Sequence, residues 1–256
     1  MTRVRLRFTK LGKVRWTSHR DVARMWERAF RRVQLPLAYS EGFTPRPKVS
    51  FGLALPTGHE SLAEYLDVEL AGGDRGVELC GDVPALLGGL SDALPDGVDA
   101  VAAAALPAGA ASLQEEVTSC TWQWVAVRAG RGRVDPGALA VSCEQLLADS
   151  TLVLTRSRKG REVTDDVREA VLDLRVLGAA GPPHAGGVRL QAELACRPRS
   201  LRPAELLAGL GAGGALEERD PRRLHQWISR DGARWEPLEA RRVATDAPPA
   251  PSERAS

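Results

Sequence analysis

Residues 18–52 read SHRDVARMWERAFRRVQLPLAYSEGFTPRPKVSFG, and this stretch decides the fold of the first half of the chain. Apolar residues recur in it at intervals of three and four, the spacing that predicts an amphipathic helix. They are Val22, Met25, Trp26, Ala29, Phe30 and Val33. Ser18, with Asp21 three residues later, has the capping-box arrangement that starts a helix, and Pro36 predicts its end.

The opposite face of this helix is basic. At about 100° per residue, five arginines share it. They are Arg20, Arg24, Arg28, Arg31 and Arg32, and only Glu27 interrupts them. A guanidinium offers paired donors that fit phosphate oxygens, so the face predicts contact with a phosphate backbone or an acidic partner. A solvated helix face with local ion pairs is the alternative interpretation.

Residues 40–48, SEGFTPRPK, form the predicted loop after the helix. Its prolines restrict the backbone, and Gly42 permits a tight turn. Arg46 and Lys48 supply positive charge, Tyr39 and Phe43 could stack a base, and Ser40 belongs to the same motif. The loop is therefore a candidate binding element. The alternative is an ordered connector whose Phe packs in the core.

Upstream, residues 3–10 alternate between apolar and basic side chains. This period of two predicts a half-buried strand with a basic outer face. The outer side chains are Arg3, Arg5 and Arg7, and we also assign Lys10 and Arg15 to the anion-binding set.

The remaining pattern of the first half predicts strands near 49–55, 63–70 and 98–106, with a helix over 82–94. The order β-α-β-β-α-β is that of a ferredoxin-like unit. After a linker at 107–116, the second half predicts a similar order. Its strands lie near 120–129, 151–158, 171–178, 188–197 and Trp227, and its helices lie near 136–148 and 203–210. We therefore predict an α+β fold of two tandem ferredoxin-like units with antiparallel sheets, at 1–106 and 117–244, and a disordered tail at 245–256. Basic residues around a hairpin in the second unit could extend the binding surface; they are Arg156, Arg158, Lys159, Arg161 and Arg168.

Net positive charge is concentrated in the first 50 residues, which hold 13 Lys or Arg and 3 Asp or Glu, although the whole chain has a net charge of only +2. This asymmetry indicates a localised anion-binding surface. The 4 cysteines show no CxxC spacing and are interpreted as reduced, buried residues. The chain shows no signal peptide and no run of about 18 apolar residues, so we expect a cytoplasmic protein without a membrane span.

Catalytic and cofactor motifs are absent from the sequence. It has no Walker-type phosphate-binding loop, no nucleophile-elbow motif, no iron–sulfur cluster motif and no metal-ligand spacing, so we predict neither a cofactor nor a metal. His19 lies beside the helix start. It could act as a general base, donate a hydrogen bond to phosphate, or simply pack. The other histidines, His59, His184 and His225, have no supporting neighbours in the sequence.

The segment from Arg7 to Tyr65 resembles the radical SAM-linked domain family, also called DUF2344. The family pattern is roughly R-F-x-K-x-G-x-x-R-x-x-S-H-x-D, then R-A-x-R-R-x-x-L-P, Y-S-x-G-F-N-P-H-P-K and E-Y. The match includes Arg7, Phe8, Lys10, Gly12, Arg15, Ser18, His19, Asp21, Arg28, Ala29, Arg31, Arg32, Leu35, Pro36, Tyr39, Ser40, Gly42, Phe43, Pro45, Pro47, Lys48, Glu64 and Tyr65. Thr44 and Arg46 replace the usual Asn and His, and Arg20 replaces a usual Leu. Ser18, Asp21, Glu64 and Tyr65 are interpreted as supporting the motif, with Glu64 ordering the loop through Lys48.

The resemblance implies association with radical SAM enzymes. Our first hypothesis is a non-catalytic accessory protein that presents the basic surface to RNA, or to an RNA-bearing substrate of a radical SAM partner. The second is a metal-independent RNA-processing nuclease that uses His19. The third is a protein–protein adaptor for a radical SAM enzyme.

Overall fold

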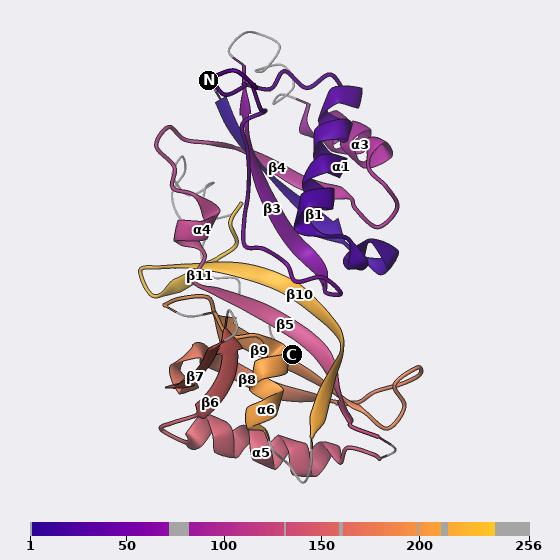
Figure 1. The fold of residues 1–256 in the computed structure, drawn as a ribbon, viewed down its shortest axis with the longest axis vertical. Coiled ribbons are helices and arrows are strands. Elements are labelled where there is room, and N and C mark those ends of the chain that lie inside the picture. Colours follow the sequence, from indigo (N-terminus) through magenta and orange to yellow (C-terminus); the bar gives the residue numbers. More distant parts are fainter. Residues whose placement is uncertain are drawn as a thin grey trace.

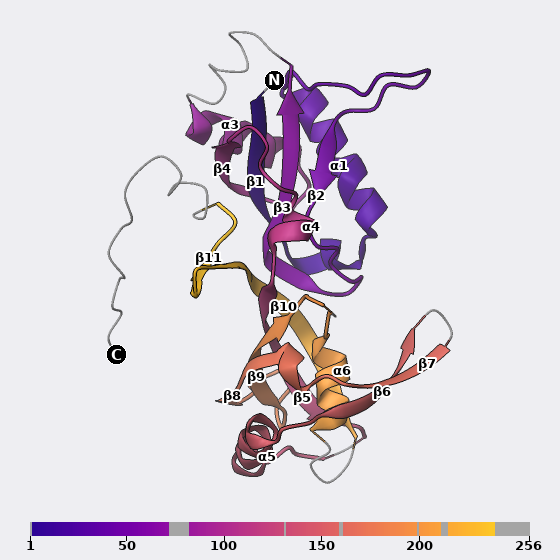
Figure 2. The same ribbon diagram turned by 90° about the vertical axis from the view of Figure 1, so that its left-hand side faces the viewer.

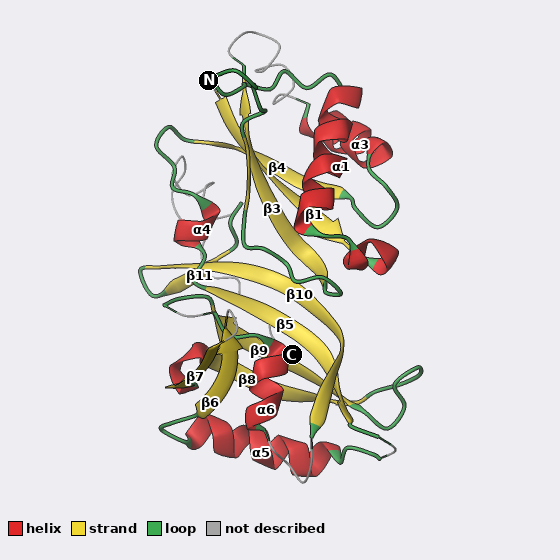
Figure 3. Cartoon of the chain, in the orientation of Figure 1, coloured by secondary structure: helices red, strands yellow, loops and turns green. Residues whose placement is uncertain are grey.

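The structure, a computed structural model, describes residues 2–71, 82–130, 132–158, 161–198, 200–210 and 215–238. The first half contains β1 (Thr2–Lys10), η1 (Gly12–Trp16), α1 (His19–Arg32), β2 (Val49–Phe51), β3 (Glu60–Leu70), α3 (Val83–Ala93), β4 (Ala100–Leu106) and α4 (Leu113–Glu116). The second half contains β5 (Ser119–Arg128), α5 (Pro136–Ala148), β6 (Val153–Arg158), β7 (Arg161–Asp166), η2 (Arg168–Ala170), β8 (Val171–Ala179), β9 (Val188–Ala195), α6 (Pro203–Gly209), β10 (Leu216–Arg230) and β11 (Ala233–Trp235). The fold is α+β, with few helices and a large, mostly antiparallel sheet (Figure 3).

One sheet runs through both halves of the molecule (Figure 1). Its strand order is β4-β1-β3-β10-β5-β9-β8, with β2 paired to β3 and β11 paired to β10. The hairpin of β6 and β7 forms a separate small sheet. The sequence predicted antiparallel sheets but did not predict that the two halves would share one. The joining pair, β3 with β10, is parallel.

Helix α1 forms where its periodicity predicts. Ser18 accepts a hydrogen bond from the backbone N–H of Asp21, and the Asp21 carboxylate accepts one from the Ser18 backbone, which completes the capping box. The apolar face is buried: Trp26 and Phe30 are fully inaccessible and Val22 is nearly so. These side chains pack with Leu6 and other apolar residues of β1, β3 and α3 into one core. A second core lies mainly in the other half.

The junction between the halves is called the seam here. Glu60 and Ser61 at the start of β3 pair with Arg222 and Arg223 of β10. After the seam, β10 continues into β11 and the chain returns to the first half (Figure 2), where Glu236 lies close to Tyr65. The two halves are therefore joined by strand pairing and by the last described residues.

Candidate nucleic-acid interface

The arginine face is the set Arg20, Arg24, Arg28, Arg31 and Arg32, and all five residues are exposed on the outward side of α1. The capped helix holds their backbones in place. At its start, the hydrogen bond from the Ser18 hydroxyl lowers the pKa of Asp21, so this carboxyl stays ionised. The face therefore carries one acidic neighbour at its amino-terminal end and several cations beyond it.

Few acidic groups neutralise the arginine face. Arg24 lies 3.6 Å from the Asp21 carboxylate, and Arg31 donates from Nε to the Glu27 carbonyl at 3.2 Å. Within the described ranges, the face makes no other salt bridge shorter than 4 Å. Such exposed i,i+3 pairs contribute little and exchange readily. The guanidinium groups are thus available for an anionic ligand.

The loop at 40–48 is a short, hydrogen-bonded projection beyond the carboxyl end of α1 (Figure 2). Tyr39 pairs with Pro47 in an isolated bridge, and the Ser40 N–H donates to the Arg46 carbonyl at 2.9 Å. The Arg46 N–H donates back to the Ser40 hydroxyl at 3.1 Å. Gly42 has φ +129°, a conformation that side chains rarely adopt. These bonds hold the loop in a defined shape.

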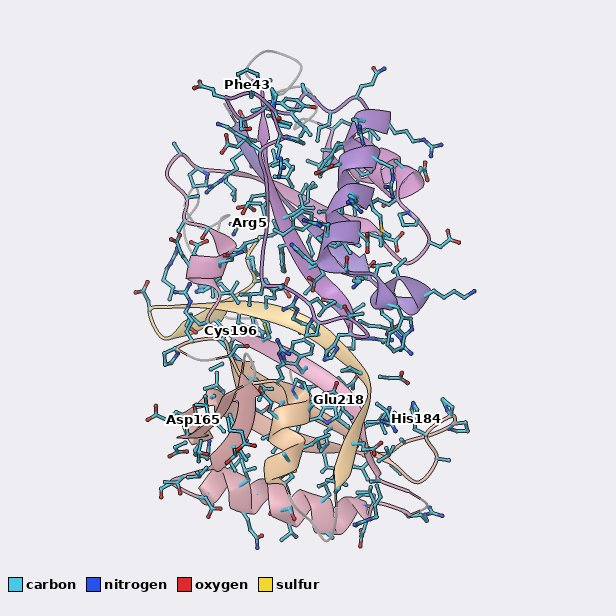
Figure 4. All side chains as sticks on the ribbon, viewed as in Figure 1. Arg5, Phe43, Asp165, His184, Cys196 and Glu218 are labelled. Carbon is cyan, nitrogen blue, oxygen red and sulfur yellow. The ribbon has the colours of Figure 1, made fainter. Side chains whose placement is uncertain are left out.

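Aromatic side chains project from this loop. Phe43 is fully exposed and Tyr39 is 51% exposed. Figure 4 shows Phe43 at the far end of the first half, away from the seam. The interpretation in which this Phe packs in the core is therefore wrong. Arg46 is exposed beside it, whereas Lys48 forms an ion pair with Glu69 at 3.1 Å.

The prediction that β1 has a basic, solvent-exposed outer face is wrong. Arg5 is wholly buried against Asp67, with Nε–Oδ1 at 2.7 Å and Nη2–Oδ2 at 2.9 Å. Arg7 binds Glu236 at 2.6 Å, and Arg3 donates to the Ala110 carbonyl. The alternation predicts that the apolar side chains point into the core and the arginines into solvent. The second face instead lies under α4 and the residues after β11, whose carboxylates and carbonyls pair with the arginines.

Lys10 and Arg15 are also engaged within the protein. Lys10 is buried and donates to the carbonyls of Arg15 and Thr17 at 3.3 and 3.0 Å, and burial lowers its pKa. Arg15 reaches across to Asp220 of β10 at 2.9 Å. Their contribution to anion binding, predicted from the sequence, is limited by these contacts.

His19 borders a small cavity of about 20 Å³, which has room for about one water molecule. Lys10, Phe51, Glu64 and Tyr65 are among the other lining residues. The imidazole makes an edge-on contact with the Phe51 ring at 5.1 Å. In the part of the chain that the structure describes, it contacts no carboxylate or second histidine. The geometry thus supplies no catalytic partner for His19.

The motif residues Glu64 and Tyr65 lie at the seam rather than at the loop. Glu64 binds the buried Arg223 at 2.6 Å, so the prediction that it orders the loop through Lys48 is wrong. Burial alone would lower the pKa of Arg223, but the charge and hydrogen bond of Glu64, together with the neighbouring Cys120 and Cys196, raise it overall. Tyr65 donates to Glu236 at 3.3 Å, and burial raises the pKa of its hydroxyl.

Several seam residues were not singled out from the sequence. Arg222 pairs with Glu60 at 2.5 Å, and Arg223 lies over the Trp122 ring at 5.4 Å. Their segment, EERDPRRLHQW at 217–227, is dense in charged residues. That density is the feature of the sequence that could have identified these residues as a charged contact. The three histidines without sequence neighbours all gain carboxylates in space. The pairs are His59–Glu218 at 3.3 Å, His184–Asp220 at 2.8 Å and His225–Glu236 at 2.6 Å.

The hairpin of the second half adds little to the surface. The predicted Lys159 lies outside the described residues, as do the side chains of Arg156, Arg158 and Arg161. The Arg168 guanidinium donates to carbonyl oxygens, among them that of Val171 at 2.8 Å. The prediction that Arg168 extends the binding surface is therefore wrong. Among the described residues, no group of three or more His, Cys, Asp or Glu could hold a metal ion. No helix in those ranges is long and apolar enough to cross a membrane.

Comparisons with known proteins give a family and distant structural likenesses. No curated protein matches the sequence. A chain in "Crystal Structure of a Cbf5-Nop10-Gar1 Complex" is 10% identical with a TM-score of 0.49, over 87% of this chain and 48% of that chain. A chain in "Structure of H/ACA RNP bound to a substrate RNA containing 2'-deoxyuridine" is 12% identical with a TM-score of 0.43, over 90% and 47%. This chain thus spans about half the length of the solved structures that it matches. The model of DUF2344, "Uncharacterized protein conserved in bacteria", matches residues 3–203, and the protein belongs to that family.

Proposed function

We propose that the protein is a non-catalytic RNA-binding protein whose binding surface is the arginine face together with the loop at 40–48. The observation that carries the proposal is the exposure of five arginines on one side of α1, with a single carboxylate within ion-pair distance among the described residues. Guanidinium groups on such a face can form charge-assisted, bidentate hydrogen bonds with the oxygens of a phosphate backbone. The exposed ring of Phe43 beside Arg46 adds a surface on which a base can stack.

The architecture supports this proposal in a secondary way. Within each half, the last strand lies beside the first, then come the third and the second, if the β6–β7 hairpin and the short strand β11 are set aside. That order supports our interpretation of two tandem ferredoxin-like units, at 1–106 and 117–244, joined by residues 107–116. A fold of this class hosts many functions, so the binding assignment rests on the surface and not on the topology.

The resemblance to radical SAM-linked proteins suggests the setting in which RNA is bound. In our proposal, the protein presents RNA, or an RNA-bearing substrate, to a radical SAM enzyme in the cytoplasm. The nuclease alternative has less support, because His19 contacts only Phe51 and the cavity lining among the described residues. The adaptor alternative would use the same arginine face for an acidic protein surface.

Fluorescence anisotropy with labelled RNA tests the proposal. Arg24→Glu combined with Arg28→Glu should abolish binding, because two cations become anions in the middle of the face. The log–log dependence of affinity on salt should have a slope of roughly −0.7 for each phosphate contacted. Arg175→Glu with Arg189→Glu is the matched control, because these exposed arginines lie on β8 and β9, outside the surface. Unchanged binding in the α1 double variant, with a normal unfolding curve, would refute the proposal.

A further inference from the structure

The exposed aromatic side chains of the described chain are concentrated around α1. Seven large hydrophobic residues are exposed among all the residues that the structure describes, and three of them are aromatic. They are Trp16 at 64%, Tyr39 at 51% and Phe43 at 110%. All three flank α1: Trp16 ends η1 just before the helix, and the other two follow its carboxyl end. Along the chain, one exposed aromatic residue therefore precedes α1 and two follow it.

Trp16 is exposed but held in position. The Arg15 guanidinium lies over its ring at 5.1 Å and is itself fixed by Asp220 at 2.9 Å. Gly58, at φ +88°, lets the turn approach the ring: a Cβ at this position would lie 2.9 Å from Cζ3 of Trp16. A side chain at residue 58 would therefore displace the ring. An aromatic surface that is both accessible and fixed loses little entropy when a flat ligand stacks on it.

Charge between the two aromatic ends is positive. Helix α1 has 14 residues and so is about 21 Å long. Along this length lie the five members of the arginine face, with only the Arg24–Asp21 ion pair among the described residues. A ligand that follows the helix would place anionic groups on the arginines and flat groups at the two ends.

We propose that this surface holds a single strand of RNA, with a base stacked on Trp16, another on Phe43, and the phosphates between them bound to the arginine face. The inference rests on the proposed function and adds to it the strandedness of the ligand and the role of Trp16. In an A-form duplex the bases are stacked inside and cannot reach protruding rings, so a duplex would use only the arginines. Stacking accepts any base, which predicts weak sequence preference.

The test compares a short labelled oligoadenylate with an RNA duplex of the same length. We expect tighter binding of the single strand. Trp16→Ala and Phe43→Ala should each weaken it about tenfold or more, since stacking on one ring contributes that much. Neither variant should change the slope of log affinity against log salt, because a stacked base releases no counterion. Trp16→Phe should retain most of the affinity. Leu172→Ala, at another exposed apolar residue, is the control and should change nothing.

Two results would overturn the inference. Equal binding of strand and duplex, with Trp16→Ala and Phe43→Ala silent while Arg24→Glu with Arg28→Glu abolishes binding, would leave the proposed function standing and remove the stacking assignment. No binding of either RNA by the wild-type chain would remove both. A protein partner whose binding depends on Trp16 and Phe43 would then identify the aromatic pair as a protein contact. Circular dichroism of each variant confirms that it is folded.

Discussion

Arg5 and Asp67 stand directly opposite each other on β1 and β3 and form a bidentate ion pair with no solvent access to the guanidinium. Breaking a buried pair leaves a charge without its partner and is strongly destabilising. We predict that Arg5→Met lowers the free energy of unfolding by about 3–5 kcal/mol, measured by urea denaturation. The double variant Arg5→Met with Asp67→Leu should recover most of that loss. If the double variant is as unstable as the single one, the loss comes from packing and not from the orphaned carboxylate.

Trp26→Ala should lower the free energy of unfolding by about 3–5 kcal/mol, because the ring is fully buried between Phe8 and Phe30. The same substitution at the exposed Trp16 is the matched control and should cost less than about 1 kcal/mol. Denaturant unfolding monitored by circular dichroism measures both. Similar losses at the two sites would contradict the assignment of the buried face of α1.

Glu60 and Glu64, the two glutamates at the seam, should differ in how much they contribute to the free energy of unfolding. Glu64→Gln leaves the buried Arg223 without its counter-charge, so we predict a loss of about 3–5 kcal/mol in unfolding free energy. Glu60→Gln weakens a pair whose arginine, Arg222, is 43% exposed, so the loss should be below about 1 kcal/mol. Thermal and urea unfolding of the two variants under one set of conditions gives the comparison. The reverse order would mean that the pair at Glu60 is the one that joins the halves.

Stability should depend on pH through Glu218. Burial raises its pKa to about 7, whereas the unfolded chain has the ordinary value near 4.3. The neutral carboxyl therefore stabilises the fold fully below about pH 4.3, and this contribution is lost as pH rises through about 7. Glu218→Gln stays neutral, so its stability relative to the wild type should increase over that window by on the order of 2 kcal/mol.

His59 gives the opposite trend and sets the design of that experiment. Burial lowers its pKa to about 4, so its contribution is present above about pH 6.5 and is lost as pH falls through about 4. Because the two trends partly cancel in the wild type, the informative quantity is the difference between Glu218→Gln and wild type at each pH. A difference that does not vary between about pH 5 and 8 would show that Glu218 is ionised in the fold.

Local patterns predicted the parts of the fold that depend on neighbouring residues. Helix α1, its capping box and the exposed arginines follow from spacing within about fifteen positions, and the structure confirms them. The turn residues of 40–48 predict a loop, and the bridge between Tyr39 and Pro47 at its base agrees with that prediction. The family was also identified from these residues, and the family model confirms it.

Distant partners explain what the sequence did not predict. The alternation in β1 indicates two different faces but not what covers the second one. Arg5 meets a carboxylate 62 positions away, and Arg7 meets Glu236, which is 229 positions away. The same limit applies to the seam, where Glu64 and Arg223 are separated by 159 residues. A period of two cannot distinguish solvent from a buried acidic neighbour.

The parallel pairing at the seam has a consequence for the order of folding. All strands of the first half lie within residues 2–106, so they can pair while the later part of the chain is still being synthesised. Strand β10 is the second-last of the strands in the described residues, yet it forms the join and also borders β5. Contacts that span this many residues carry a large loop-closure entropy and form slowly. We expect the seam to close last. Arg7 and Glu64 therefore remain without their partners, Glu236 and Arg223, until those residues have been synthesised.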